Sequence, residues 1–161
     1  MVIFQSARIA MTTVYDVPAD RLIASIAEHI KKEGKVEPPE WSAFAKTGVH
    51  KEKSPTQGDW WYGRLAAVLR KVYLNGPIGS ERLAALFGGK EDRGSKPYKA
   101  RSGSRAVARQ CLKQLEELGY VSVIEKQGRV ISPAGQSLLD NSSHEILKDM
   151  AKDDPELTKY V

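Results

Sequence analysis

The sequence predicts a mainly α-helical fold with a winged-helix core, in which a helix-turn-helix carries a β-hairpin wing, and with additional helices at both ends. Helical patterns at 80–87 and 104–118 flank a turn-rich segment, the order of elements in a helix-turn-helix. Two short β-rich runs at 120–126 and 129–132 follow, separated by a Gln-Gly turn that is typical of a hairpin. Because winged helices bind nucleic acids or other proteins, the pattern by itself leaves both kinds of partner open.

The chain has the length of one domain. Its 161 residues, 41% hydrophobic and 28% charged, are enough to bury a core without disulfides or metals. We expect this domain at 11–150 and a polar, acidic tail at 151–161. A second methionine, Met11, directly precedes the first patterned segment, so residues 1–10 are either a misassigned start or a loose extension. We expect weak order at both ends.

Two helical segments precede the longest helix. The first runs from Pro18 to Gly34, which supplies the stop, and two lysines near its end suit the helix dipole. Its apolar residues at helical spacing are Leu22, Ile23, Ile26, Ala27 and Ile30. A short helix is expected from Pro39 to about Gly48, and residues 49–58, which have no periodicity and several turn formers, predict a loop.

The longest predicted helix spans 60–75, with Asp59 as its N-cap and Gly76 after its end. At about 100° per residue, one of its faces is apolar. That face consists of Trp61, Leu65, Val68, Leu69 and Val72. A neighbouring face consists of Trp60, Gly63, Arg64, Ala67, Arg70 and Lys71. Because this second face combines cations with small residues, we expect it to lie against either a phosphate backbone or another helix.

Basic residues continue into the second half of the chain. Segment 90–103 is polar and basic, with one Tyr and one Pro, and predicts a loop. Ser104 begins a helix that runs to Leu118 and has an apolar face. The opposite face carries Arg105, Arg109 and Lys113 at four-residue intervals, continued backward by Arg101 if the first turn extends that far. Like charges one turn apart repel each other, and a polyanion would relieve the repulsion. Pro133 then opens a last helix.

The charge distribution predicts an anionic partner. The chain carries a net charge of +5, but residues 46–109 hold fourteen Lys or Arg and five Asp or Glu, a local charge of +9 that leaves the rest at −4. The single cysteine can form no internal disulfide, and no apolar run approaches the length that spans a membrane. We therefore expect a cytoplasmic protein.

Residues suited to catalysis are scarce in this sequence. The three histidines lie in separate segments, and Cys111 falls on the apolar face of its helix, where a buried packing thiol is the better interpretation. No CxxC, HxxxH or dense carboxylate pattern predicts a metal site. Gly88, Gly89 and Lys90 lack the other residues of a phosphate-binding loop. The sequence predicts no enzyme, no cofactor and no metal.

The adjacent tryptophans of the long helix invite a base-stacking hypothesis, because an aromatic face beside Arg is typical of proteins that bind single-stranded RNA. Trp61 aligns with the apolar face and is expected in the core. Trp60 lies beside Arg64, and both a core role and an RNA contact stay open for it.

Eight segments of the chain occur in a specific order: TVYDVPAD, PPEW, KTGVHKE, GDWWYGRLAAVLRKVYLNGPIG, FGG, RGSKP, SGSRAVARQCLKQLEELGYV and GRVISPAGQSLLD. In this order they resemble the archaeal form of the small-subunit ribosomal protein nineteen family of archaeal/eukaryotic type. The resemblance covers Met11 to about Met150, whereas the first ten residues and the acidic tail depart from it.

This resemblance implies a winged-helix protein that binds ribosomal RNA in the head of the small subunit. It also implies, by analogy with eukaryotic members, a part in subunit maturation. The family's functional positions fall here on Trp60, Arg64, Arg70, Lys71, Arg101, Ser104, Arg105 and Arg109. The adjoining basic segment adds Lys96 and Lys99.

The resulting prediction is a structural ribosomal protein whose partners are ribosomal RNA and neighbouring head proteins, and which is monomeric off the ribosome. The alternative is a winged-helix transcription regulator bound to duplex DNA, which would normally be dimeric. A solution mass, or competition between ribosomal RNA and duplex DNA, would discriminate between the two.

Overall fold

The computed structural model describes residues 12–154 and 156–157. Within these residues the chain forms five α-helices, one short 3-10 helix and two separate antiparallel hairpins, so the mainly helical class is confirmed. The helices are α1 (Ala19–Glu33), η1 (Glu40–Ala43), α2 (Trp60–Asn75), α3 (Ser80–Leu86), α4 (Arg105–Glu117) and α5 (Pro133–Asp153). The hairpins pair β1 (Gly89–Arg93) with β2 (Lys96–Arg101), and β3 (Val121–Ile124) with β4 (Gly128–Ile131).

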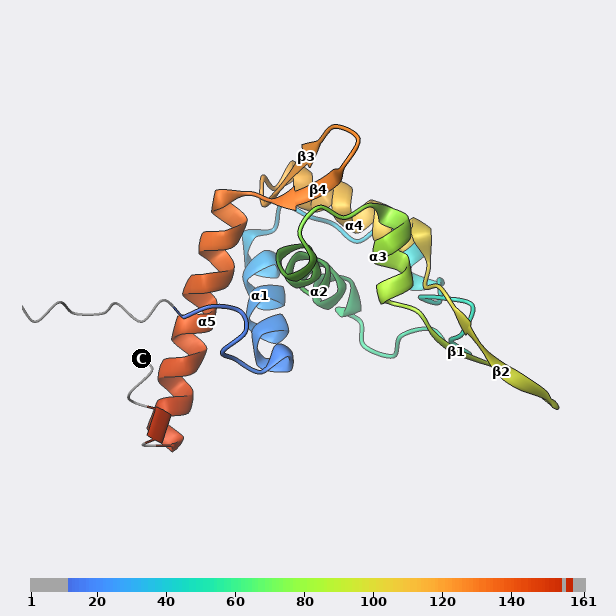
Figure 1. Cartoon of the computed structure of the whole chain (residues 1–161), viewed down its shortest axis with the longest axis horizontal. Coiled ribbons are helices and arrows are strands. Elements are labelled where there is room, and N and C mark those ends of the chain that lie inside the picture. The colour runs from blue at the N-terminus through green and yellow to red at the C-terminus, as the bar shows by residue number, and fades with distance from the viewer. Residues whose placement is uncertain (1–11, 155, 158–161) are drawn as a thin grey trace, which may run out of the picture.

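The long helix α2 is the centre of the core. Its predicted apolar residues, Trp61, Leu65, Val68, Leu69 and Val72, are all buried. Helices α1, α4 and α5 and strand β4 contact it, and α3 packs on α4. Figure 1 shows α2 between α1 and α5 on one side and α3 and α4 on the other. Apolar residues of all five α-helices therefore contribute to the core.

The ends of the helices agree with the local sequence signals, with two exceptions. Helix α1 ends at Gly34, which adopts the left-handed conformation (φ 62°), and α2 begins and ends where predicted. Asp59 precedes α2 but caps no backbone N–H; its carboxylate accepts from Lys31 Nζ at 2.6 Å instead, so its predicted capping role is wrong. The short helix after Pro39 spans only Glu40–Ala43.

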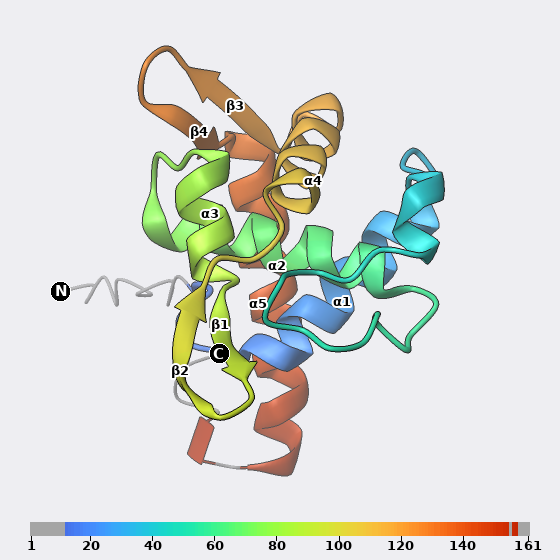
Figure 2. The same cartoon turned by 90° about the vertical axis from the view of Figure 1, so that its right-hand side faces the viewer.

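The segment predicted to be a loop at 90–103 contains the β1–β2 hairpin, and this prediction is wrong. Gly94 makes the turn with φ 68°, and its N–H donates to Asp92 Oδ1 at 2.8 Å. Strand β2 is exposed along its whole length, so neither of its faces packs on the core. Its sequence therefore lacks the alternation of apolar and polar residues by which strands are usually predicted. The hairpin projects away from the helices in Figure 1, in a direction that faces the viewer in Figure 2.

The β3–β4 hairpin is predicted correctly and is attached to the core. Ile78 and Arg129 exchange two backbone hydrogen bonds, of 2.9 and 3.0 Å, which join β4 to the residues just before α3. Gly128 (φ 117°) follows the turn, where a Cβ would lie 2.8 Å from the Ile78 carbonyl group. The β3–β4 hairpin therefore has a fixed position relative to α3.

The last helix continues to Asp153, three residues into the segment predicted as a tail. We expect weak order in residues 1–10 and in the last few residues; apart from 156–157, these residues lie outside the part of the chain that the structure describes. No helix in the part of the chain that the structure describes is long and apolar enough to cross a bilayer.

Candidate nucleic-acid interface

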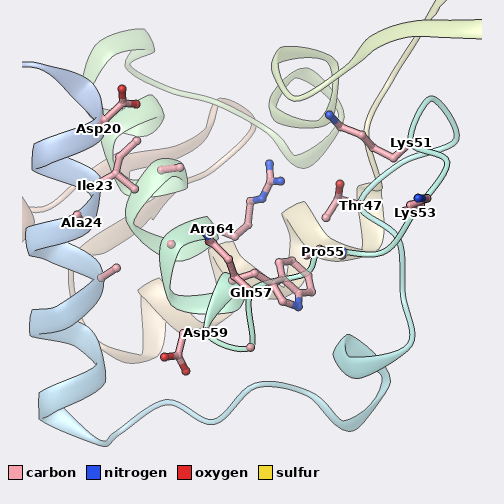
Figure 3. Close-up of a pocket in the computed structure, with 15 residues that line it drawn as sticks. Asp20, Ile23, Ala24, Thr47, Lys51, Lys53, Pro55, Gln57, Asp59 and Arg64 are labelled. Atoms are coloured by element: carbon pink, nitrogen blue, oxygen red, sulfur yellow. The ribbon is translucent and has the colours of Figure 1, made fainter.

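A groove of about 990 Å³ opens between α1, the segment 47–59 and the first half of α2. From α2 it is lined by Trp60, Gly63, Arg64 and Ala67, four members of the mixed face predicted beside the apolar one. Figure 3 shows Arg64 between α1, which carries Asp20, and the segment that carries Lys51 and Lys53. The mixed face therefore packs towards α1 on one side and remains accessible from the groove.

Two partly buried side chains define the α2 wall of the groove. Trp60 packs edge-on against Trp61 with ring centroids 5.3 Å apart, so it belongs to the border of the core and to the groove at once. The Arg64 guanidinium lies 4.5 Å from the centroid of the Phe87 ring. Burial lowers the pKa of Arg64, although the group remains a cation at neutral pH because its ordinary value is so high. Arg64 is thus a cation held in one orientation.

Arg70 and Lys71 lie farther along α2 and do not line the groove. Both are half-buried, and the buried Nε of Arg70 has no hydrogen-bond partner among the described residues. The predicted α2 residues are therefore divided between two places, with Trp60 and Arg64 in the groove and this pair outside it.

The β1–β2 hairpin carries three of the predicted cations on β2. Lys96 and Lys99 are exposed, whereas the Arg101 Nε donates to Glu91 Oε2 at 2.8 Å across the hairpin. Because α4 begins only at Arg105, Arg101 belongs to a strand and does not continue the cationic face of the helix. The condition under which Arg101 would continue that face, a first helical turn that reaches back to it, is therefore not met.

Helix α4 presents Arg105, Arg109 and Lys113 to solvent. Its opposite face buries Val107, Ala108, Cys111 and Leu115 in the core. Ser104 is the N-cap, and its hydroxyl accepts from the Val107 N–H at 3.4 Å, a local structural role that spacing alone had not assigned to it. Arg105 stands in the first turn, where the helix dipole disfavours a cation. A polyanion on this face would relieve both that cost and the mutual repulsion of the three charges.

The groove, the hairpin and α4 meet at one junction. The Ser104 N–H donates to the Thr47 carbonyl oxygen at 2.8 Å, and Gly48 forms a β-bridge with Gly103. The His50 ring fills the space beside Gly48 and Gly89, where an added Cβ would lie 2.8 Å from it. Segment 47–59 is therefore fixed beside the hairpin and the start of α4, which are distant from it in the sequence.

Comparisons with known proteins show the family to which the chain belongs. The chain matches the profile of the family described as ribosomal protein S19e over residues 13–149. The chain belongs to the ribosomal protein S19e family. It is 48% identical to small ribosomal subunit protein eS19 of Thermoplasma acidophilum, over 94% of this chain and the whole relative. Identity is 47% with eS19 of Aeropyrum pernix and 39% with eS19B of Schizosaccharomyces pombe, the latter over 87% of this chain and 98% of the relative.

Membership in the S19e family confirms the predicted ribosomal function: the chain is a structural protein of the small ribosomal subunit, not an enzyme. It also decides against the DNA-binding regulator. Ribosomal RNA and ribosomal proteins are the partners that membership implies.

The single cysteine of this S19e-family protein lies in the core. Cys111 is fully buried, and burial raises the pKa of its thiol to about 12, so it is the packing thiol that the sequence predicts. Within residues 12–154 and 156–157, no three His, Cys, Asp or Glu side chains gather as metal ligands would.

Reasoning from the sequence missed several residues of the candidate interface. Lys51 and Lys53 line the groove from a segment whose position no periodicity indicates. Phe87, which holds Arg64, was assigned only to a helix pattern. At Gly88 a Cβ would collide with the Arg101 carbonyl oxygen, so this glycine permits the close approach of β2. The adjacent glycines 88 and 89 were the one local signal of such close approach.

Proposed function

We propose that this S19e-family protein binds ribosomal RNA of the small subunit through three linked surfaces. The groove wall is formed by Trp60 and Arg64, the basic hairpin carries Lys96, Lys99 and Arg101, and the α4 stripe consists of Arg105, Arg109 and Lys113. Ser104, Arg70 and Lys71 complete the proposed set, Ser104 through the start of α4 and the other two through the second half of α2. The junction of Thr47, Gly48, Gly103 and Ser104 supports a single RNA-binding region.

The arrangement of α2, α3, α4 and the β3–β4 hairpin supports a winged helix. In that arrangement α3 and α4 would be the helix-turn-helix pair, α4 the helix presented to nucleic acid and β3–β4 the wing. The bridge between Ile78 and Arg129 supports this, because it pairs a residue just before α3 with β4. The basic hairpin occupies the place of the turn between α3 and α4.

The single observation that carries the proposal is the α4 stripe. Its three cations share an exposed face at one-turn intervals, and neither Arg105 nor Arg109 has an ion-pair partner among the described residues. Arginine suits such a surface because its planar guanidinium binds phosphate oxygens through two parallel hydrogen bonds. The position in the subunit head and a part in subunit assembly belong to the same proposal and are supported by the family resemblance.

The test is charge reversal on α4 in the double variant Arg105→Glu/Arg109→Glu. We expect this variant to lose co-sedimentation with small subunits, while its melting temperature by circular dichroism stays close to that of the wild type, because exposed substitutions usually change stability by about 0.5 kcal/mol or less each. Arg101 is left unchanged, since a Glu there would face Glu91 and disturb the hairpin itself.

A matched control is Arg21→Glu/Lys148→Glu, which changes the net charge equally at exposed positions of α1 and α5. The control should co-sediment as the wild type does. Normal co-sedimentation of the well-folded α4 variant would refute the α4 stripe as an RNA contact. Equal loss of co-sedimentation in both variants would show that the net charge of the protein, and not the α4 stripe, is responsible.

A further inference from the structure

Tyr98 is an exposed aromatic residue in the middle of the basic hairpin. Its side chain is 67% exposed on β2, in a hairpin that projects away from the helices (Figure 1). Tyr15, which has a similar exposure, packs edge-on against Tyr73, but no aromatic ring or cation packs on Tyr98 within residues 12–154 and 156–157. The ring therefore presents an unoccupied π-face to solvent.

The pairing of the strands separates the two faces of the hairpin. Glu91 pairs with Lys99, and the ion pair from Arg101 to Glu91 places these three residues on one face. Tyr98 and Ala100 alternate with them and belong to the other face, where Lys90 lies opposite Ala100. On that face the small Ala100 is Tyr98's neighbour along the strand, and Lys90 lies on the diagonal.

The hairpin has little support from the rest of this chain. Two-stranded hairpins are marginally stable in water on their own, and both of its faces carry charges in place of the apolar residues that would pack on a core. Residues 89–101 contain five Lys or Arg and two Asp or Glu, which favours an anionic partner over an average protein surface. An aromatic ring between lysines matches a partner that offers both phosphates and flat apolar surfaces.

We propose that Tyr98 stacks on an unpaired base of RNA while the lysines of the hairpin contact the phosphates on either side. The ring supplies a π-face, which every base can use, and Ala100 leaves space beside it. Lys90 and Lys96 neutralise the backbone of the same strand, and Lys99 contacts a phosphate from the opposite face of the hairpin. This inference rests on the proposed RNA-binding function and adds to it a mode of contact that phosphate binding alone does not require.

The experiment measures binding of the full-length chain to a transcript of the small-subunit rRNA head domain. The variants are Tyr98→Phe, Tyr98→Leu and Tyr98→Ala, with Lys99→Ala as the matched control on the opposite face. We expect Tyr98→Phe to bind within about twofold of the wild type, and Tyr98→Leu and Tyr98→Ala to bind about 5- to 150-fold more weakly, as the loss of one base–aromatic stack predicts. Tyr98→Leu keeps an apolar side chain and removes only the ring, so it separates stacking from general apolar contact.

Salt dependence separates stacking from charge. The slope of log Kd against log salt should be unchanged in every Tyr98 variant, because stacking releases no counterions. In Lys99→Ala the slope should become shallower by the amount that one phosphate contact contributes. Because the side chain is exposed, melting temperatures should be unchanged; if Tyr98→Ala did not fold, the comparison of Tyr98→Phe with Tyr98→Leu would still decide.

Wild-type affinity in Tyr98→Leu would overturn the stacking inference. So would normal RNA binding by Tyr98→Ala combined with failure to enter the subunit, since the hairpin would then contact a protein. These outcomes leave the proposed function intact as long as the wild type binds the transcript and Lys99→Ala weakens it. Failure of the wild type to bind the transcript would contradict the proposed function itself.

Discussion

Trp60 and Trp61 are adjacent in the sequence and have different surroundings in the fold. Trp61 is fully buried, and its Nε1 donates to Gln114 Oε1 at 2.8 Å. The Gln114 Nε2 in turn donates to the Glu37 carbonyl oxygen at 2.9 Å. The Gln114 side chain therefore links the indole N–H of Trp61 to the backbone at Glu37 through two hydrogen bonds. Trp60 is rotated by about 100° on the helix, which carries it to the groove. One helical step therefore separates a core residue from a residue of the candidate interface.

Replacement of these two residues should have unequal effects on stability. Trp61→Ala should lower the free energy of unfolding by about 3–5 kcal/mol, because it leaves a cavity and removes the partner of the Gln114 side chain. Trp60→Ala should cost clearly less and should instead weaken RNA binding. Urea denaturation of both variants measures the difference. Equal losses of stability would contradict the division of α2 into a core face and a groove wall.

At the scale of elements, the segments are joined by a few specific polar contacts in addition to the core. Tyr120, just before β3, donates from its hydroxyl to Glu33 Oε1 at the end of α1, at 2.8 Å. Burial, followed by the hydrogen bond to Glu33 and its charge, raises the pKa of Tyr120 to about 12. The contact thus joins the first helix to the start of the β3–β4 hairpin and holds only while the phenol is protonated.

This contact should make the stability of the protein sensitive to alkaline pH. Because the folded pKa of Tyr120 lies above its unfolded value of about 10, the contribution is complete below pH 10 and is lost as the pH rises towards 12. Tyr120→Phe should therefore be less stable than the wild type at pH 8, by about 0.5–1.5 kcal/mol for the hydrogen bond, and the gap should narrow by pH 11. Denaturation at both pH values tests this, and a constant gap would contradict it.

At the scale of the molecule, the positive charge lies on one side. Residues 46–109, with a charge of +9, form the segment along the groove, α2, α3, the basic hairpin and the start of α4. Helices α1 and α5, in the part of the chain that is net acidic, lie on the other side of α2 (Figure 1). An asymmetric charge of this kind orients the protein before contact with a polyanion and disfavours binding through the α5 side.

Affinity for RNA should accordingly fall steeply with salt. If Lys96, Lys99, Arg105 and Arg109 each neutralise one phosphate, the slope of log affinity against log salt should be about −3, at 0.7–0.9 per contact. Filter binding over a series of salt concentrations measures the slope, which should become shallower in Arg105→Glu/Arg109→Glu and stay unchanged in Arg21→Glu/Lys148→Glu. A flat profile in the wild type would contradict the polyanion interpretation.

The sequence by itself determined the helices, the β3–β4 hairpin and the inward or outward direction of their side chains. Helical periodicity is a local property, so the burial of Trp61 and Leu65 and the exposure of Arg105 and Arg109 follow from spacing along one segment. Gly34 and the Gln-Gly turn likewise act through their own backbone conformation. These features needed no knowledge of what packs against them.

Only the tertiary structure decided how the basic segments combine. The β1–β2 hairpin has no apolar alternation to predict it, and the pairing of Asp59 with Lys31 spans 28 residues, so neither appears in local spacing. Arg64 gains its fixed orientation from Phe87, and the groove exists only because segment 47–59 is held at Gly48 and Gly103. Such contacts depend on closing long loops and on close backbone approach. They therefore arise when the core assembles, and the pattern of any one segment does not contain them.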